Sequence, residues 1–163
     1  MIILRPATEA DQKTIVAIIR QVRINPMNLK WPNFIVAVDD ATGQIVGIGQ
    51  VKTHGDGSRE LASIAVLPGY RRRGIARQII QRLMAQHGNA GTLFLTCQSS
   101  LGQFYEQFGF RAIGEQEMTP YFRRLMKVAS VIGLLARDDE TLLVMKRDVA
   151  MASEPWQWHP HAM

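Results

Sequence analysis

Val66-Leu-Pro-Gly-Tyr-Arg-Arg-Arg-Gly-Ile-Ala76 is the most informative stretch of this sequence. It joins an apolar run typical of a strand, residues 61–67, to a run with helical periodicity over residues 75–87. Backbone N–H groups in the first turn of a helix have no partner within the helix, and the helix dipole favours negative charge there. Gly74 has no Cβ, so a ligand can come close to the backbone. The stretch therefore predicts a loop that binds a phosphate or pyrophosphate.

Length and composition bound the class of protein. The chain has 163 residues, 47% of them hydrophobic, which predicts one globular domain with a substantial core. A net charge of +5 favours an anionic ligand without itself indicating nucleic acid. The lone Cys97 excludes an internal disulfide and fits a reducing compartment. With neither a signal-peptide pattern nor an apolar run of about 20 residues, we expect a cytoplasmic protein with no membrane partner.

The periodicity along the chain predicts an alternation of strands and helices in one domain, with a C-terminal tail over residues 149–163 that lacks clear periodicity and could be flexible. The predicted domain covers about residues 1–148. Its predicted strands are 2–5, 34–38, 45–53, 60–67, 93–97, 110–113 and 142–146, and its predicted helices are 9–22, 75–87, a short one around 104–108, and a basic one over 118–135.

Two motifs occur in order along this domain. The first is Arg71-Arg-Arg-Gly74-Ile-Ala76, between a predicted strand and a predicted helix, and the second is Phe104-Tyr105-Glu-Gln-Phe108-Gly109-Phe110. Together they resemble the GNAT superfamily of N-acetyltransferases, whose acetyl-CoA signature reads Arg or Gln, two residues, Gly, one residue, then Gly or Ala. The second motif is similar to that family's short helix with an aromatic pair, followed by Gly-Phe. The resemblance spans nearly the whole domain.

The resemblance implies both a fold and a cosubstrate. The implied fold is of the α/β class (α+β type), with a mixed, mostly antiparallel, twisted sheet of about six or seven strands flanked by helices. Acetyl-CoA would lie in a V-shaped cleft between central strands, its pyrophosphate wrapped by the loop and its pantetheine arm bonded to the strand before it. The family often has an Asn at the start of the helix after Cys97, where this chain has two serines. The implied contacts are Ile64, Ala65, Val66, Arg71, Arg72, Arg73, Gly74, Ile75, Ala76, Ser99, Ser100 and Tyr105.

Two residues are candidates for acid–base chemistry. Glu60 lies upstream of the loop, at a position that resembles the general base of some family members, and it would take a proton from the attacking amine. It could instead be an edge glutamate paired with Arg59 or a lysine. Tyr105 would lie near the thioester sulfur and donate a proton to the leaving thiolate, or it could simply pack beside its aromatic neighbours. A backbone N–H from residues 64–66 would stabilise the oxyanion.

Other features allow further interpretations. Cys97 is expected to be an inert core thiol, and His159 and His161 are weak evidence for a metal, so no metal is expected. The segment 118–135 could be a lid over the acceptor, a homodimer surface or a packed helix. The acceptor could be a small amine, an amino acid, or a lysine or N-terminus of a protein. The alternative function is a non-catalytic CoA-binding regulatory module; the absence of an RNA-binding aromatic motif or DNA-reading helix argues against nucleic acid.

Overall fold

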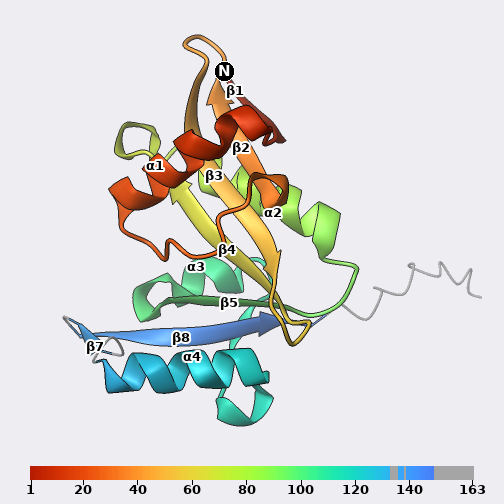
Figure 1. Cartoon of the computed structure of the whole chain (residues 1–163), viewed down its shortest axis with the longest axis vertical. Helices are drawn as coiled ribbons and strands as arrows, with labels where there is room; N and C mark the ends of the chain where they lie inside the picture. The colour runs from red at the N-terminus through yellow and green to blue at the C-terminus, as the bar shows by residue number, and fades with distance from the viewer. Residues whose placement is uncertain (133–135, 138, 149–163) are drawn as a thin grey trace, which may run out of the picture.

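The computed structural model describes residues 1–132, 136–137 and 139–148. A continuous path of seven strands forms a sheet in the order β1-β2-β3-β4-β5-β8-β6, and β7 pairs with β8 beside that path (Figure 1). All neighbours on the path are antiparallel except β4 and β5. The expected mixed, mostly antiparallel sheet is confirmed. The strands are β1 (Ile2–Pro6), β2 (Phe34–Asp39), β3 (Gln44–Thr53), β4 (Arg59–Val66), β5 (Leu93–Gln98), β6 (Arg111–Ala112), β7 (Ala136–Arg137) and β8 (Glu140–Arg147).

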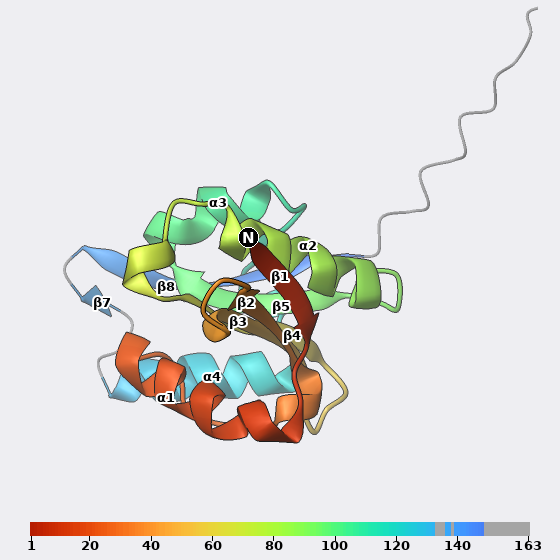
Figure 2. The ribbon, with the colours of Figure 1, turned by 90° about the horizontal axis from the view of Figure 1, so that it is seen from above.

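Four α-helices cover the two faces of the sheet, α1 and α4 on one face and α2 and α3 on the other (Figure 2). Alternating side chains of β2 explain this division: Phe34 and Val36 pack with α1, while Ile35 and Ala37 pack with α2. Phe122 of α4 is fully buried and packs with Phe94 of β5. The helices are α1 (Gln12–Val22), α2 (Ile75–His87), α3 (Gly102–Glu106) and α4 (Pro120–Val131).

An irregularity in β4 shapes the centre of the sheet. Ile48 pairs with Ala65 and Gln50 pairs with Ala62, so two residues of β4 oppose the single Gly49 of β3. This is a β-bulge, and Ser63 adopts a left-handed backbone with φ 58° within it. A Cβ on Gly49 would lie 2.6 Å from Cγ2 of Ile79, so only glycine lets α2 pack this closely opposite the bulge.

The parallel pairing of β4 with β5 is short. It covers only Arg59 with Leu93 and Glu60 with Phe94, after which no further pairing joins the two described strands. Beyond Glu60 the strands diverge, and this divergence is the V-shaped cleft that the family resemblance implies. Glu60 therefore lies at the narrow end of the cleft.

Most predicted elements are present with small shifts at their ends. The basic helix is shorter than predicted: α4 begins at Pro120, ends at Val131, and is followed by β7, which the sequence did not indicate. The predicted helix around 104–108 ends at Glu106 because Gly109, with φ 90°, turns the chain toward β6. The tail 149–163, with its two histidines, lies outside the described residues.

Candidate active site

A cavity of about 430 Å³ occupies the cleft between β4 and β5. Residues 60–64 of β4 form one wall and residues 96–98 of β5 the other. Tyr105 of α3 and the segment 22–25 after α1 also line it. The cavity therefore joins side chains from both faces of the sheet, which is where two substrates approaching from opposite sides would meet.

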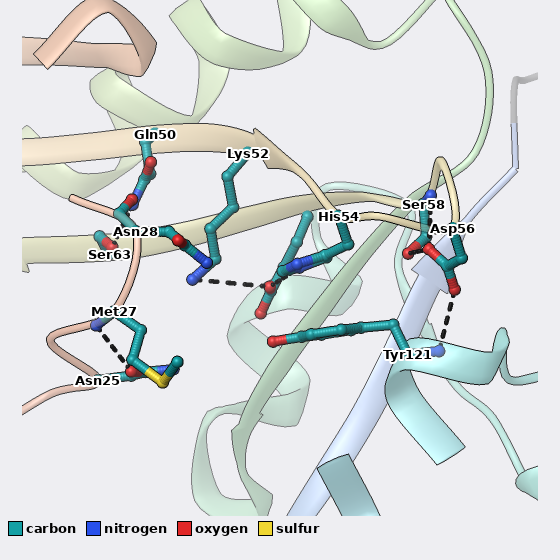
Figure 3. Close-up of polar contacts among 11 residues, drawn as sticks. Asn25, Met27, Asn28, Gln50, Lys52, His54, Asp56, Ser58, Ser63 and Tyr121 are labelled. Carbon is teal, nitrogen blue, oxygen red and sulfur yellow. Dashed lines mark hydrogen bonds and ion pairs between the residues drawn. The ribbon is translucent and has the colours of Figure 1, made fainter. Parts of the chain in front are cut away.

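Glu60 is buried at the narrow end of this cavity, with 5% of its surface exposed. Its Oε2 lies 2.6 Å from Nε2 of His54 and 3.9 Å from Nζ of Lys52. Both partners are themselves buried, and Figure 3 shows them extending from neighbouring positions of β3 and the turn after it. Of the partners considered for an edge glutamate, Arg59 is not one, because it donates to the backbone carbonyls of His87 and Gly91, whereas a lysine partner is present in Lys52. Glu60 is buried and does not lie at an edge of the sheet.

His54 is fixed by an aromatic stack from α4. Its ring lies parallel to that of Tyr121, with centroids 3.4 Å apart and 11° between the planes, and Phe122 meets it edge-on. Figure 3 shows the Tyr121 ring beneath His54, with its hydroxyl pointing away from α4. Burial, with the nearby carboxylates of Glu60 and Asp56, raises the pKa of Tyr121, so this hydroxyl stays protonated.

Asp56 attaches α4 to the turn that carries His54. Its carboxylate accepts hydrogen bonds from the backbone N–H of Tyr121, at 2.9 Å, and from the backbone and hydroxyl of Ser58. These bonds, led by the Ser58 hydroxyl, hold the pKa of Asp56 well below its usual range. An ionised carboxylate at the N-terminus of a helix is also favoured by the helix dipole. The first turn of α4 thus supports the histidine that contacts Glu60.

Tyr105 reaches the cavity from α3, on the opposite face of the sheet from α4. Its ring packs edge-on against Phe104 and Phe110. Burial, with a smaller contribution from Cys97, raises the pKa of Tyr105 to about 12, so the phenol remains a proton donor at neutral pH. The buried Cys97 thiol has a pKa raised to about 11, mainly by burial, which fits the expected inert thiol rather than a nucleophile.

The arginine loop forms a second cavity, of about 200 Å³, between the end of β4 and the start of α2. Arg71, Arg72, Gly74, Ile75 and Ala76 line it. Gly74 precedes the helix with φ 75°, and a Cβ placed there would have no atom within 4 Å, so the space above it is open. The three arginines differ in placement.

Of these arginines, Arg71 donates from Nε to the Val66 carbonyl at 3.1 Å, and the Arg73 guanidinium lies over the Tyr70 ring, 5.1 Å from its centroid. Arg73 does not line the cavity. Arg71 thus closes the loop onto the strand, and Arg72 lines the cavity as a residue with a left-handed backbone, φ 64°.

The remaining predicted contacts lie around the cleft. Ile64 lines the large cavity, Val66 lines the small one, and Ala65 is buried between them. Ser99 donates its hydroxyl to Glu140 at 2.9 Å, and the same carboxylate accepts the backbone N–H of Ser100. Neither serine lines either cavity; both are hydrogen-bonded to Glu140 at the start of β8.

Sequence reasoning did not single out Lys52, His54, Tyr121 or Arg23. One signal was available for the first two: Gln50, Lys52 and His54 alternate, and alternate residues of a strand share a face. Lys52 pairs directly with Glu60 in the sheet. The role of Tyr121 had no local signal, because α4 and the turn at Asp56 are 65 residues apart in sequence.

The cleft thus brings a buried carboxylate and a phenol into one cavity, and the arginine loop lies at the start of α2 beside a second cavity. A family model described as an acetyltransferase (GNAT) domain matches residues 30–112, about half of the chain, including β2 to β6. The chain belongs to the GNAT family of N-acetyltransferases, as its two motifs indicated. No protein of curated function matches the sequence.

Solved structures share the fold at low sequence identity. N-acetylglutamate synthase from Neisseria gonorrhoeae, complexed with coenzyme A and N-acetyl-glutamate, matches 91% of this chain with a TM-score of 0.71 and 18% identity; this chain spans 35% of it. Rv2747 from Mycobacterium tuberculosis, in complex with CoA, matches 90% of this chain and 98% of its own length, with a TM-score of 0.67 and 20% identity. The ribosomal-protein-S18-alanine N-acetyltransferase from Escherichia coli matches 95% and 98%, with a TM-score of 0.65 and 18% identity.

None of the described helices is both long and apolar enough to cross a membrane. Within the same residues, no three His, Cys, Asp or Glu side chains gather in a way that could hold a metal ion.

Proposed function

We propose that the protein transfers an acetyl group from acetyl-CoA to a primary amine by direct attack in a ternary complex. The observation that carries the proposal is that Glu60 and Tyr105 line one cavity where β4 and β5 diverge, although they come from different elements and Tyr105 lies on the opposite face of the sheet from α4. A base for the amine and an acid for the leaving thiolate are the two groups that this reaction needs.

The first requirement is to deprotonate the amine. A lysine-like amine has a pKa of about 10.4, so near neutral pH only about one in a thousand is uncharged, which costs roughly 4 kcal/mol. Glu60 takes the proton, directly or through water. His54 and Lys52 hold its carboxylate in place at the narrow end of the cavity.

The second requirement is to stabilise charge at the thioester. The bulge at Ser63 leaves backbone groups of β4 outside the ladder with β3, and the divergence from β5 leaves its other edge unpaired along the cavity. A backbone N–H here donates to the oxygen on which negative charge develops. Tyr105 then donates to the departing sulfur, and its raised pKa keeps the phenol protonated at neutral pH.

The residues present fit acetyl-CoA. The small cavity combines the N-terminus of α2, three arginines (Arg71, Arg72 and Arg77) and the open space above Gly74, a combination suited to a pyrophosphate. Val66 and Ile64 connect it along β4 to the large cavity, where the arm would lie. When bound, acetyl-CoA supplies the activated acetyl group. Ser99 and Ser100 stay proposed contacts on the family resemblance alone, because Glu140 accepts both the Ser99 hydroxyl and the Ser100 backbone N–H.

The acceptor class is the open part of this proposal. Among the neighbours with this fold, one was solved with N-acetyl-glutamate and another is named for an alanine of a ribosomal protein, so both small amino acids and protein amines are candidates. Catalysis is favoured over a non-catalytic CoA-binding module because a module of that kind needs the arginine loop but neither buried Glu60 nor Tyr105.

The test is an acceptor screen with acetyl-CoA that reads free thiol across small amines, amino acids and lysine peptides. Transfer that is lost in Glu60→Gln and Tyr105→Phe supports the proposal. Binding of acetyl-CoA without release of thiol to any acceptor supports the regulatory module instead. Unchanged turnover in both variants would remove the assigned roles.

A further inference from the structure

The acceptor side of the large cavity carries more positive than negative charge. Of the described residues that line it, Arg23 and Lys52 are cations and Glu60 is the only carboxylate. Lys52 lies 3.9 Å from Glu60, and that pair is internally compensated. The Arg23 guanidinium is then the surplus charge at this cavity, and a surplus charge at a cleft favours a ligand of opposite sign.

Arg23 is placed at the cavity by an unusual backbone. It follows the last residue of α1 with φ 57° and ψ 41°, a left-handed conformation for which glycine is the usual residue. Among the ion pairs between described residues, none involves Arg23. Its side chain is exposed and lines the cavity, so an anion entering the cleft would meet an available guanidinium.

We infer that the acceptor is a small amine that also carries a carboxylate, an α-amino acid, with its amine toward Glu60 and its carboxylate bound by Arg23. This inference rests on the proposed transferase function. A guanidinium binds a carboxylate with two parallel hydrogen bonds, which orients the acceptor as well as holding it. The Glu60 carboxylate is the proposed acceptor of the amine proton, so the amine and the carboxylate of an amino acid each find a group suited to them in one cavity.

The same charges disfavour other acceptors. A polyamine or another multiply cationic acceptor would meet Arg23 and Lys52 with repulsion and find only Glu60 as a counter-charge. An internal lysine of a protein brings an amine without an adjacent carboxylate and leaves Arg23 without a ligand. An amino acid amide has the same size as the acid and lacks only the charge, so it is the most discriminating comparison.

The experiment compares matched acceptors. Phenylalanine, phenylalaninamide and 2-phenylethylamine, and the same triad built on alanine, are each assayed with acetyl-CoA by thiol release. The other amino acids are tested as acid and amide, and peptides with a free N-terminus or lysine are included. The amide has the less basic amine and so the larger neutral fraction. A preference for the acid therefore reports binding of the carboxylate and not reactivity of the amine.

Arg23→Gln is the test variant, and Arg20→Gln, on the exposed surface of α1 and outside the cavity lining, is its control. For at least one amino acid we expect kcat/KM to exceed that of its amide about 10- to 100-fold, as expected for a charged hydrogen-bonded pair. Arg23→Gln removes this preference, mainly through KM, and Arg20→Gln keeps it. Circular dichroism and thermal unfolding check that both variants are folded.

The outcomes separate this inference from the function on which it rests. The inference is wrong if simple amines or peptides are acetylated with no preference for a carboxylate. It is also wrong if the preference survives in Arg23→Gln. In both cases the transferase function still stands. If none of the acceptors tested leads to release of thiol, both the inference and the transferase function are overturned.

Discussion

The imidazole Nε2 of His54 lies 2.6 Å from Oε2 of Glu60, in a contact buried on both sides. The contact is held from one side by β3 and β4 and from the other by the Tyr121 ring of α4. A carboxylate fixed in this way keeps one orientation toward the cavity, because rotating away would break the short contact with His54. In this account His54 is a positioning residue, and Glu60 is the group that meets the acceptor.

His54→Phe tests this relationship, because phenylalanine keeps an aromatic ring against Tyr121 and removes both ring nitrogens, including the Nε2 that contacts Glu60. We expect kcat to fall about 10- to 100-fold, as for a mispositioned catalytic group, with the KM for acetyl-CoA unchanged. A cycle with Glu60→Gln measures the coupling: the double variant should be no slower than Glu60→Gln alone. If the two effects multiply instead, the residues act independently and the positioning role is wrong.

Gly74→Glu tests the placement of the pyrophosphate. The substitution puts a carboxylate and a side chain into the small cavity, where Arg71 and Arg72 lie, so acetyl-CoA binding in calorimetry should fall below detection. Gly57→Glu is a matched control, since Gly57 also has a positive φ, 85°, with no atom within 4 Å of a built Cβ, and lies in the turn between β3 and β4. This control variant has the same backbone strain and should bind acetyl-CoA normally. Wild-type affinity in the Gly74 variant would refute the placement.

The raised pKa of Tyr105 leads to a prediction about how the transfer rate depends on pH. Because burial raises its pKa to about 12, the phenol stays protonated throughout the range in which the acceptor amine loses its proton. The wild-type rate should therefore rise with pH from about 6 to about 10 without a falling limb from this group. Tyr105→Phe should be slower by about 10- to 100-fold. A falling limb below about pH 10 that disappears in the variant would contradict this assignment.

The lowered pKa of Asp11 leads to a prediction about how stability depends on pH. Its carboxylate accepts two hydrogen bonds from the Arg5 guanidinium and one from the backbone of Thr8, which lower its pKa from 3.8 to about 2, the Arg5 bonds contributing most. The stabilisation is therefore present above about pH 4 and is lost as the pH falls toward about 2. Arg5 is partly exposed, so Asp11→Asn should cost only about 1 kcal/mol at neutral pH.

Thermal unfolding against pH checks the size and sign of this effect. Asp11→Asn should reduce the loss of stability between these pH values without abolishing it, because the pKa values of Glu117 and Asp56 are lowered as well. Glu9→Gln, an exposed change in the same turn, should leave the loss unchanged. Equal pH dependence in the wild type and Asp11→Asn would show that another group is responsible.

The sequence predicted those parts of the fold that depend on local signals. The helix after the arginine loop begins at Ile75 and ends at His87 as predicted, because Gly74 and Gly88 mark its ends. The strand at 93–97 was visible as a short apolar run between a glycine turn and two serines. The cleft came from the family resemblance, since neither motif by itself indicates where β4 and β5 stop pairing.

What the sequence could not predict depends on contacts between distant segments. Ser63 has no local feature that marks a left-handed bulge, and His54 lies beyond the end of β3, in the turn before β4. The strand pairing of Lys52 with Glu60 becomes visible only once the register is known. Arg23 joins the cavity only when the end of α1 is placed over β4. The arginine loop was therefore predictable from sequence, whereas the acceptor side of the site was not.

The most direct test of the account is the rate of acetyl transfer by Glu60→Gln, measured at saturating acetyl-CoA beside the wild type. Glutamine keeps the shape and can still contact His54 but cannot take a proton. It also leaves Lys52 without its charge partner, so thermal unfolding must confirm a folded variant. We expect Glu60→Gln to lower kcat/KM for the acceptor by about 100-fold or more, while the affinity for acetyl-CoA is retained. A folded Glu60→Gln variant that transfers acetyl groups at the wild-type rate would contradict it.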